Sequence, residues 1–314
     1  MNRKQNKSKI KAFLQVSRAN LLLASIGHPA IGLFLGASVL SDLLTWEVPL
    51  YVLLHYCIAF FACNLNCICD YDVDRHYKKY MSDNVDVIGK RFLKIIIILE
   101  FLLSIFIISF FYLNGYLIVS ILGLIALFVV YSYSAEPFRI KKHGILSPLP
   151  ILVLYTIPML CGWLIFKNYI TFYFFIFIIG YVLMQEGFTL VNTCEDYNED
   201  KKENIRTWAH RFGLKNTLRT SFVFSITGIL CIIGLVLKYL IKYDYNIYFD
   251  IISIVNIIFI FITLLLILKA SFEVRETYLG DNLEKRAKKY GKRLQKWFIM
   301  TRYPLMICAI IMLL

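Results

Sequence analysis

Two acidic clusters in this chain share one pattern of oxygen-bearing side chains. Each follows Asn-x-x-x-Asp-x-x-x-Asp at the end of a long apolar run, and the two are 126 residues apart. The positions are Asn66, Asp70 and Asp74 in the first cluster and Asn192, Asp196 and Asp200 in the second. Because residues four apart share a helix face, each cluster presents a row of oxygen ligands. Magnesium binds through one or two carboxylates plus substrate phosphates, so the pattern indicates divalent cations that hold a polyphosphate at a membrane face.

Helix capping is the alternative explanation for these residues, since Asp and Asn commonly cap helices. Capping would explain either cluster alone. Two clusters with the same spacing favour cation binding, because carboxylates at the end of a membrane helix are unfavourable unless something compensates them. Asp72 and Glu195 fall about 100° or 200° away around the helix, so we expect them to be solvated or to support the ligands.

A basic segment forms a third candidate element. Pro137 is expected to end a helix, with Arg139 and Lys141 projecting from an extended stretch toward phosphate oxygens. Lys201 and Arg206 follow the second acidic cluster and offer similar contacts. The alternative for Arg139 and Lys141 is positive-inside anchoring at the membrane.

The elements that must position these residues are predicted to be membrane helices. The chain is 59% hydrophobic, and apolar runs of about 20 residues alternate with charged loops. We predict an all-α integral membrane protein with a single domain over residues 1–314, in which residues 1–18 form a basic N-terminal segment and not a removable signal peptide. The nine expected spans are 19–41, 47–68, 93–112, 116–134, 147–166, 170–192, 217–240, 247–270 and 297–314.

The net charge of +13 is read as membrane topology and not as nucleic-acid binding. With nine spans, 29 of the 34 Lys and Arg residues fall in the N-terminal segment and the loops on its side. The positive-inside rule then places the N-terminus and both acidic clusters in the cytoplasm and the C-terminus on the opposite side. Basic loops also suit anionic lipid headgroups.

Cysteines and one basic segment leave alternatives open. A zinc site near Cys63, Cys67, Cys69 and Cys194 must be weighed, but no CxxC pair or paired Cys/His spacing supports it, and small space-filling thiols fit better. The segment 273–297 is dense in Lys and Arg with intermittent Leu and Tyr. It is expected to be either an amphipathic helix at the interface or a lid over the active face.

With these motifs in order, the chain resembles the UbiA superfamily of intramembrane prenyltransferases. The first cluster resembles that family's Asn-x-x-x-Asp-x-x-x-Asp motif, the second its later Asp-x-x-x-Asp motif, and Tyr133–Lys141 its Tyr-Ser-x-x-Pro-x-Arg-x-Lys segment. Two departures leave the acceptor and subfamily open. Many members have Asp where this chain has Cys67, and many carry an Arg-Pro pair where this chain has Lys78-Lys79 without a proline.

The resemblance implies a nine-helix bundle around a central cavity and transfer of a prenyl group from a prenyl diphosphate. Two Mg²⁺ ions would promote ionisation to an allylic cation, which an electron-rich acceptor attacks. The implied metal ligands are Asp70, Asp74, Asp196 and Asp200, with Asn66 and Asn192 beside them. The implied diphosphate contacts are Arg139, Lys141, Lys201 and Arg206.

The sequence leaves two identities open: the molecule that receives the prenyl group, and the residue that takes the proton from it. The acceptor is expected to be aromatic or quinone-type, with a glycerol-phosphate lipid, a porphyrin or a sugar phosphate as alternatives. His76, His143 and His210 lie on the active side and could take the acceptor proton. Two other functions are weighed: a terpene cyclase of the same fold, and a cation-coupled transporter. Transport predicts acids near mid-span, whereas these clusters end the spans, which favours an enzyme.

Overall fold

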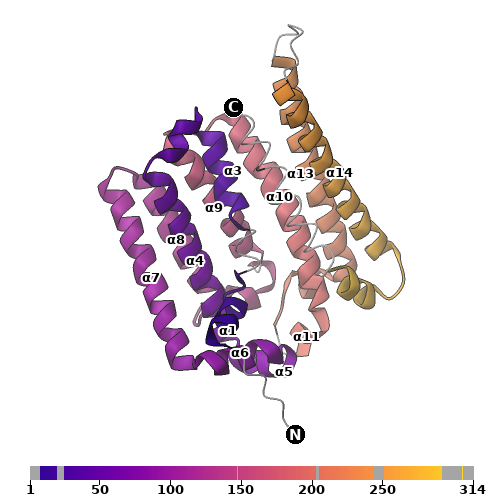
Figure 1. Cartoon of the computed structure of the whole chain (residues 1–314). Helices are drawn as coiled ribbons and strands as arrows, with labels where there is room; N and C mark the ends of the chain where they lie inside the picture. Colours follow the sequence, from indigo (N-terminus) through magenta and orange to yellow (C-terminus); the bar gives the residue numbers. More distant parts are fainter. Residues whose placement is uncertain are drawn as a thin grey trace. The chain divides into compact units, whose positions relative to one another are not determined.

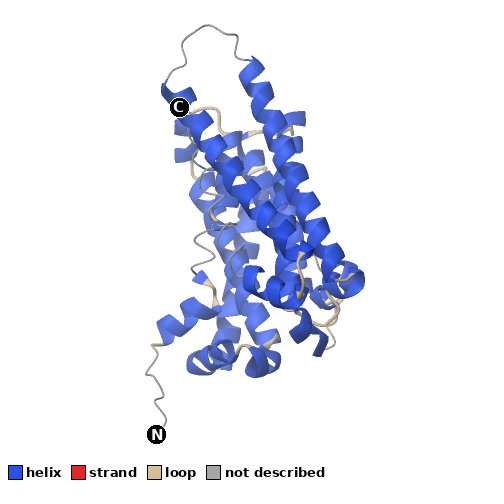
Figure 2. Cartoon of the chain, turned by 90° about the vertical axis from the view of Figure 1, so that its right-hand side faces the viewer, coloured by secondary structure: helices blue, strands red, loops and turns tan. Residues whose placement is uncertain are grey.

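The chain folds into helices. The computed structural model describes residues 8–19, 25–146, 148–202, 205–242, 251–291 and 306, and their regular segments are helical (Figure 2). This confirms the predicted all-α class. The chain groups into two compact units, one of Met1–Ile26 with Pro49–Ile140 and one of Gly27–Val48 with Lys141–Leu314.

The first unit carries the first acidic cluster. Its helices are α1 (Lys9–Val16), α4 (Glu47–Cys69), α5 (Tyr71–Tyr77), α6 (Lys79–Ile88), α7 (Lys90–Leu113) and α8 (Leu117–Ser134). The helices α7 and α8 pack side by side, as Figure 1 shows. Gly115 makes the turn between them, with a φ of 88° that favours glycine.

A buried amide connects three helices of this unit. The Asn64 side chain accepts a hydrogen bond from Ser17 Oγ at 3.0 Å and donates one to Glu100 Oε1 at 2.8 Å. Because a buried polar group without a partner is destabilising, these bonds fix the region after α1 against α4 and α7. The helix that carries the first acidic cluster is therefore held by a polar contact as well as by apolar packing.

The second unit carries the second acidic cluster. Its elements are α3 (Gly27–Gly36), η1 (Leu40–Leu44), η2 (Ile140–Lys142, which begins at the last residue of the first unit), η3 (Gly144–Leu146), α9 (Leu149–Phe166), α10 (Phe172–Glu195), α11 (Tyr197–Lys202), α12 (Trp208–Phe212), α13 (Leu214–Lys242) and α14 (Ile251–Leu279).

Small residues let the helices of this unit approach closely. A Cβ on Gly162 would lie 2.7 Å from Pro29 O, and one on Gly32 would collide with the backbone oxygen of Met159. The helices α10, α13 and α14 run side by side in Figure 1, with Gly180 and Gly228 at the contact between α10 and α13. Such close backbone packing is common in membrane helix bundles.

Six helices among the described residues are long and apolar enough to cross a membrane. They lie within α4, α7, α8, α10, α13 and α14. The prediction of nine is not confirmed: the 147–166 run forms α9, whose apolar part 152–166 is shorter, and the 19–41 run yields α3 of ten residues. The 297–314 run lies outside the described residues except for position 306.

One helix boundary was predicted wrongly. The last of these helices, α14, continues to Leu279, nine residues beyond the expected end at 270. Hydropathy marks where a helix leaves the apolar layer but not where its backbone hydrogen bonds stop, and residues 271–279 are more polar yet helical.

Candidate functional site

The first acidic cluster lies where one helix ends and a short helix begins. Asp70 stands between α4 and α5, and the backbone bonds Asp70 N–Asn66 O (2.9 Å) and Asp74 N–Asp70 O (2.8 Å) continue the four-residue spacing across this junction. All three side chains are partly exposed, whereas Asp72 is exposed. The four-residue spacing expected from the sequence is therefore present in the backbone, and the role of these side chains as metal ligands stays a prediction.

Arg139 joins the first acidic cluster. Its Nη2 donates to Asp70 Oδ1 at 2.8 Å, and its Nη1 lies 3.5 Å from Glu136 Oε1. Its Nε is buried without a hydrogen-bond partner in the described structure. The guanidinium thus holds the carboxylate and keeps one donor that an anion could use.

The loop that delivers Arg139 differs from the prediction. The helix α8 ends at Ser134, before Pro137, and Arg139 has a φ of 36° at the start of the short 3₁₀ segment η2. An extended stretch carrying both Arg139 and Lys141 was therefore the wrong expectation. The left-handed φ is uncommon outside glycine, and such strain often marks functional positions.

Ser134 is a site residue that the sequence did not single out for a role. Its hydroxyl donates to Asn66 Oδ1 at 3.2 Å, so α8 contacts the amide at the head of the acidic row. The third motif and the first are therefore in direct contact through Ser134–Asn66 and Arg139–Asp70. The Tyr-Ser pair within the quoted motif was the available signal.

The second acidic cluster repeats the same construction in the other unit. The helix α10 ends at Glu195, Asp196 stands at the junction, and α11 begins at Tyr197. Asp200 N donates to Asp196 O at 2.9 Å, which preserves the four-residue spacing. Asn192 belongs to α10, and its side chain lies outside what the structure describes.

The basic residues of the second unit come from two segments that meet. His143 and Arg206 form an isolated parallel bridge, and the Gly144 N–H donates to the Arg206 carbonyl. This brings the stretch after Lys141 alongside the stretch that follows the second acidic cluster. Lys201 and Arg206 are exposed, and Lys141 is partly exposed.

His210 has a structural partner, unlike the expectation that it could serve as a base. Its Nε2 donates to the Tyr197 carbonyl at 2.8 Å, and its ring stacks on Tyr197 with centroids 4.3 Å apart. Its Nδ1 accepts from Thr207. Nε2 and the ring therefore tie α12 to α11, and Nδ1 caps the start of α12 through Thr207. His76 and His143 are exposed.

Among the described residues, the cysteines near the clusters form no disulfide. Cys67 and Cys194 are buried, and Cys67 Sγ lies 3.5 Å from the Val16 carbonyl. Within the described residues, no group of three or more His, Cys, Asp or Glu side chains is placed to hold a metal ion.

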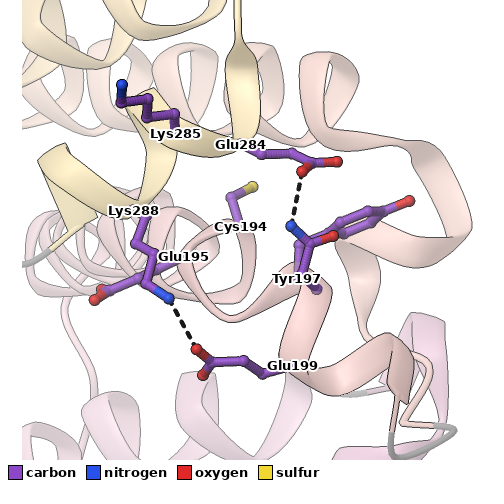
Figure 3. Close-up of a pocket in the computed structure, with 8 residues that line it drawn as sticks. Cys194, Glu195, Tyr197, Glu199, Glu284, Lys285 and Lys288 are labelled. Carbon is purple, nitrogen blue, oxygen red and sulfur yellow. Dashed lines mark hydrogen bonds and ion pairs between the residues drawn. The ribbon is translucent and has the colours of Figure 1, made fainter.

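A pocket of about 300 Å³ opens beside the second cluster (Figure 3). Its lining comes from the end of α10, from α11 and from the residues after α14: Cys194, Glu195, Tyr197, Asn198, Glu199, Glu284, Lys285 and Lys288. Sequence reasoning considered Cys194 and Glu195 individually, and it covered Glu284, Lys285 and Lys288 only as part of the basic segment 273–297. It did not select Tyr197, Asn198 or Glu199. The charged residues of the pocket lie far apart in the sequence, so no spacing pattern marks them.

Comparison with known proteins gives one family and one fold. A model of the UbiA prenyltransferase family matches residues 26–282. The chain resembles a structure of digeranylgeranylglyceryl phosphate synthase, with 22% identity and a TM-score of 0.67 over 96% of this chain and 99% of that chain. No curated protein matches the sequence.

Two further solved structures share the fold. One is a UbiA homologue from Archaeoglobus fulgidus bound to GPP and Mg²⁺, with 18% identity and a TM-score of 0.65 over 94% of this chain and 99% of that chain. The other is a UbiA homologue from Aeropyrum pernix K1, with 14% identity and a TM-score of 0.62 over 90% of this chain and 98% of that chain.

Proposed function

The chain belongs to the UbiA prenyltransferase family, and from this premise we propose that it is an intramembrane prenyltransferase. It would transfer a prenyl group from a prenyl diphosphate to an aromatic, quinone-type or lipid acceptor. The observation that carries the proposal is the contact of Arg139 with Asp70 at the end of α4. A cationic donor beside a metal-binding carboxylate is the pairing that a magnesium diphosphate requires.

The donor set fits magnesium. Asp70 and Asp74 in one unit and Asp196 and Asp200 in the other offer partly exposed oxygens, two carboxylates from each cluster, and no thiolate is needed. Two carboxylates leave most of an octahedral shell for diphosphate oxygens and water. When bound, magnesium would offset the charge that develops on the leaving diphosphate. A structure of an A. fulgidus homologue with GPP and Mg²⁺ supports an ion-bound donor, and the number of two ions is our proposal.

The side chains of the protein have separate tasks in this proposal. Asn66 and Asn192 orient the ligands at the head of each acidic row. Arg139 neutralises diphosphate oxygens and orients Asp70 through its ion pair. Lys141, Lys201 and Arg206 add positive charge on the second unit. Their partial or full exposure suits groups that receive a charged substrate from water.

We further propose that both acidic rows face one cavity in a single nine-helix domain, with the allylic chain among the membrane helices. Excluding water there would protect an allylic cation from hydrolysis. The distribution of Lys and Arg supports a cytoplasmic N-terminus and cytoplasmic active-site loops, with the C-terminus opposite. The synthase of a glycerol-phosphate lipid among the similar structures supports a lipid acceptor as much as an aromatic one.

The transporter alternative requires acids near mid-span, and among the described spans Glu100 and Glu186 lie well away from the helix ends. Glu100 of α7 accepts from Asn64, and Glu186 of α10 is buried. Both acidic clusters, however, lie at helix ends beside basic residues, and this position supports an enzyme and not a transporter. No observation on the described residues favours a terpene cyclase over a transferase.

The test incubates purified protein with geranylgeranyl diphosphate, Mg²⁺ and a panel of aromatic and lipid acceptors. The products are identified by mass. A prenylated acceptor is the expected outcome. Diphosphate release with a cyclised hydrocarbon would replace the transferase with the cyclase, and no diphosphate release from donors of any chain length would overturn both enzyme functions.

A further inference from the structure

The short helix α11 carries Asp200 but has little packing of its own. It spans six residues, Tyr197–Lys202, and none of them is buried. On one side, Tyr197 packs at the edge of the buried cluster, and its ring and carbonyl contact His210 of α12. Because the five residues after Tyr197 are all polar, the orientation of the rest of α11 depends on contacts made by polar side chains.

The residues after α14 supply two of these contacts. Lys288 Nζ donates to Glu199 Oε1 at 2.9 Å, and Asn198 Nδ2 donates to Glu284 Oε2 at 2.7 Å. Figure 3 shows both bonds crossing from the helical segment 283–291 to α11, on either side of the pocket. Asn198 and Glu199 stand between the proposed ligands Asp196 and Asp200, so the contacts act on the ligand-bearing turn.

The segment 283–291 is itself anchored on the core. Ala287 is fully buried, and Leu283 and Tyr290 pack against the buried cluster of the second unit. Gly291 lies so close to Glu195 that a Cβ there would be 2.5 Å from Glu195 Oε2. The backbone of the segment 283–291 is thus held in place by packing, and the Lys288 side chain extends from it to Glu199.

An exposed ion pair alone contributes little, because two long side chains must be ordered in water. Here the backbone of the segment 283–291, which carries Lys288, is already fixed by packing. A second hydrogen bond, Asn198–Glu284, joins the same two segments. Hydrogen bonding and charge from Glu199 raise the pKa of Lys288 above its ordinary value, with smaller contributions from Asp196 and Glu195. Lys288 therefore stays charged at neutral pH, and its ammonium group is bonded to Glu199, which stands one residue before Asp200.

We infer that the segment 283–291 is a brace that holds α11 in the orientation that Asp196 and Asp200 need to bind magnesium, with Lys288 as its positioning residue. The inference rests on the proposed function for the identity of the ligand. It replaces both expectations for this basic stretch: residues 283–291 neither lie as a free amphipathic helix nor need to open and close as a lid. Lys288 acts through Glu199 and touches no substrate.

The test compares Lys288→Met with Lys288→Arg, Glu199→Gln and the exchange Glu199→Lys/Lys288→Glu in the full chain. Lys285→Met is the matched control, because Lys285 lines the same pocket but points away from the acidic side chains (Figure 3). Diphosphate release is measured against Mg²⁺ concentration. Hydrogen exchange of the peptide that covers α11 is measured without metal or substrate.

Lys288→Met and Glu199→Gln should raise the half-saturating Mg²⁺ concentration about tenfold, the low end for partners that orient metal ligands. The rate at saturating Mg²⁺ should change by less than about twofold, since the variants remove no transition-state contact. Exchange in α11 should accelerate. Lys288→Arg and the double exchange should restore both values, and Lys285→Met should change neither.

An unchanged Mg²⁺ dependence in Lys288→Met, or an equal change in Lys285→Met, would overturn the inference. Failure of the proposed function is distinguishable, because the unaltered protein would then release no diphosphate at any Mg²⁺ concentration. In that case, faster exchange of α11 in Lys288→Met would still support the brace, and unchanged exchange would overturn it.

Discussion

Arg139 Nη2 lies 2.8 Å from Asp70 Oδ1, and the two side chains are only 13% and 16% exposed. The contact joins the loop after α8 to the junction of α4 and α5. It places a fixed positive charge on the carboxylate that is the proposed magnesium ligand. Binding of the metal to Asp70 and of the diphosphate to Arg139 would therefore be coupled through one ion pair.

Replacing Arg139 should weaken the use of the prenyl diphosphate. For Arg139→Gln we expect kcat/KM for the donor to fall about 10²-fold, because a preorganised charge that faces the leaving group is lost. Arg139→Lys should retain only part of the kcat/KM of the unaltered protein, since the lysine ammonium lacks the planar fork of N–H donors that the arginine guanidinium has. Initial rates of diphosphate release over a range of donor concentrations measure both effects.

The control for Arg139 is Arg91, which is exposed at the start of α7 in the same unit. Arg91→Gln should leave kcat/KM within about twofold, as a surface substitution away from the site normally does. If kcat/KM fell equally in both variants, the effect would be due to the net charge of the protein and not to the contact of Arg139 with Asp70.

Each of the two acidic clusters should be essential for diphosphate release, so that one substitution in either cluster is enough to stop it. Asp70→Asn or Asp196→Asn should lower diphosphate release at least about 10²-fold at any practical Mg²⁺ concentration, because an amide does not replace a carboxylate ligand. Chelation of Mg²⁺ by EDTA should abolish release, and added Mg²⁺ should restore it. Asp72→Asn is the matched control, since Asp72 is exposed between the ligand positions. Full activity in Asp70→Asn or Asp196→Asn would remove that residue from the metal site.

The four-residue spacing at the helix ends could be predicted from the sequence because it is local, while the metal-binding role of these residues stays a prediction. The four-residue intervals at Asp70 and Asp196 translate directly into backbone bonds between successive turns. The class of fold was predictable for a similar reason, since apolar runs of this length indicate membrane helices. Both signals are carried by neighbouring residues.

Contacts between distant segments could not be predicted. The Ser134–Asn66 bond joins positions 68 apart, and Lys288–Glu199 joins positions 89 apart. No period in the sequence encodes which loop reaches which helix end. The shape of the loop at Arg139 was missed because proline predicts where a helix cannot continue but not the left-handed turn that follows at Arg139.

Gly32 should be required for the packing of α3 on α9. In Gly32→Ala the new methyl group would collide with the Met159 carbonyl, so the helices must separate, and we expect a loss of about 1–3 kcal/mol in the free energy of unfolding. At Gly234 of α13 an added methyl group would meet no atom within 4 Å, so Gly234→Ala should instead stabilise by up to about 1 kcal/mol. Thermal unfolding in detergent measures both. Similar midpoints for the two variants would contradict the close contact.

Asp42 should make the stability of the loop before α4 depend on acid pH. Its carboxylate accepts from the Ser38 and Val39 N–H groups at 2.7 and 3.2 Å, and these bonds lower its pKa below the ordinary 3.8, with a smaller contribution from Lys167. A lowered pKa means that the stabilisation is present above pH 3.8 and is lost as the pH falls through the folded-state value. Hydrogen exchange at Ser38 and Val39 should therefore accelerate in acid beyond its intrinsic pH dependence. In Asp42→Asn this additional change should vanish, and its persistence would assign it to another group.

Glu186 should be a source of instability and not a catalytic group. It lies within α10, is 2% exposed, and neither carboxylate oxygen has a hydrogen-bond partner among the described residues. Since a buried polar group without a partner is unfavourable, Glu186→Met should raise the free energy of unfolding by about 1–3 kcal/mol. Diphosphate release should be unchanged, because the residue stands more than two turns before the end of α10, after which Asp196 follows.

Glu100 of α7 provides the contrast, since it is also an acid within a membrane helix but accepts from Asn64 at 2.8 Å. Glu100→Met leaves that buried amide without an acceptor and should lower the free energy of unfolding by about 1–3 kcal/mol. Chemical unfolding of both variants in the same detergent separates the two cases by sign. If Glu186→Met folds normally but loses diphosphate release, the carboxylate takes part in the reaction. If it instead loses ion-driven uptake in proteoliposomes, the transporter function gains the mid-span acid that it requires.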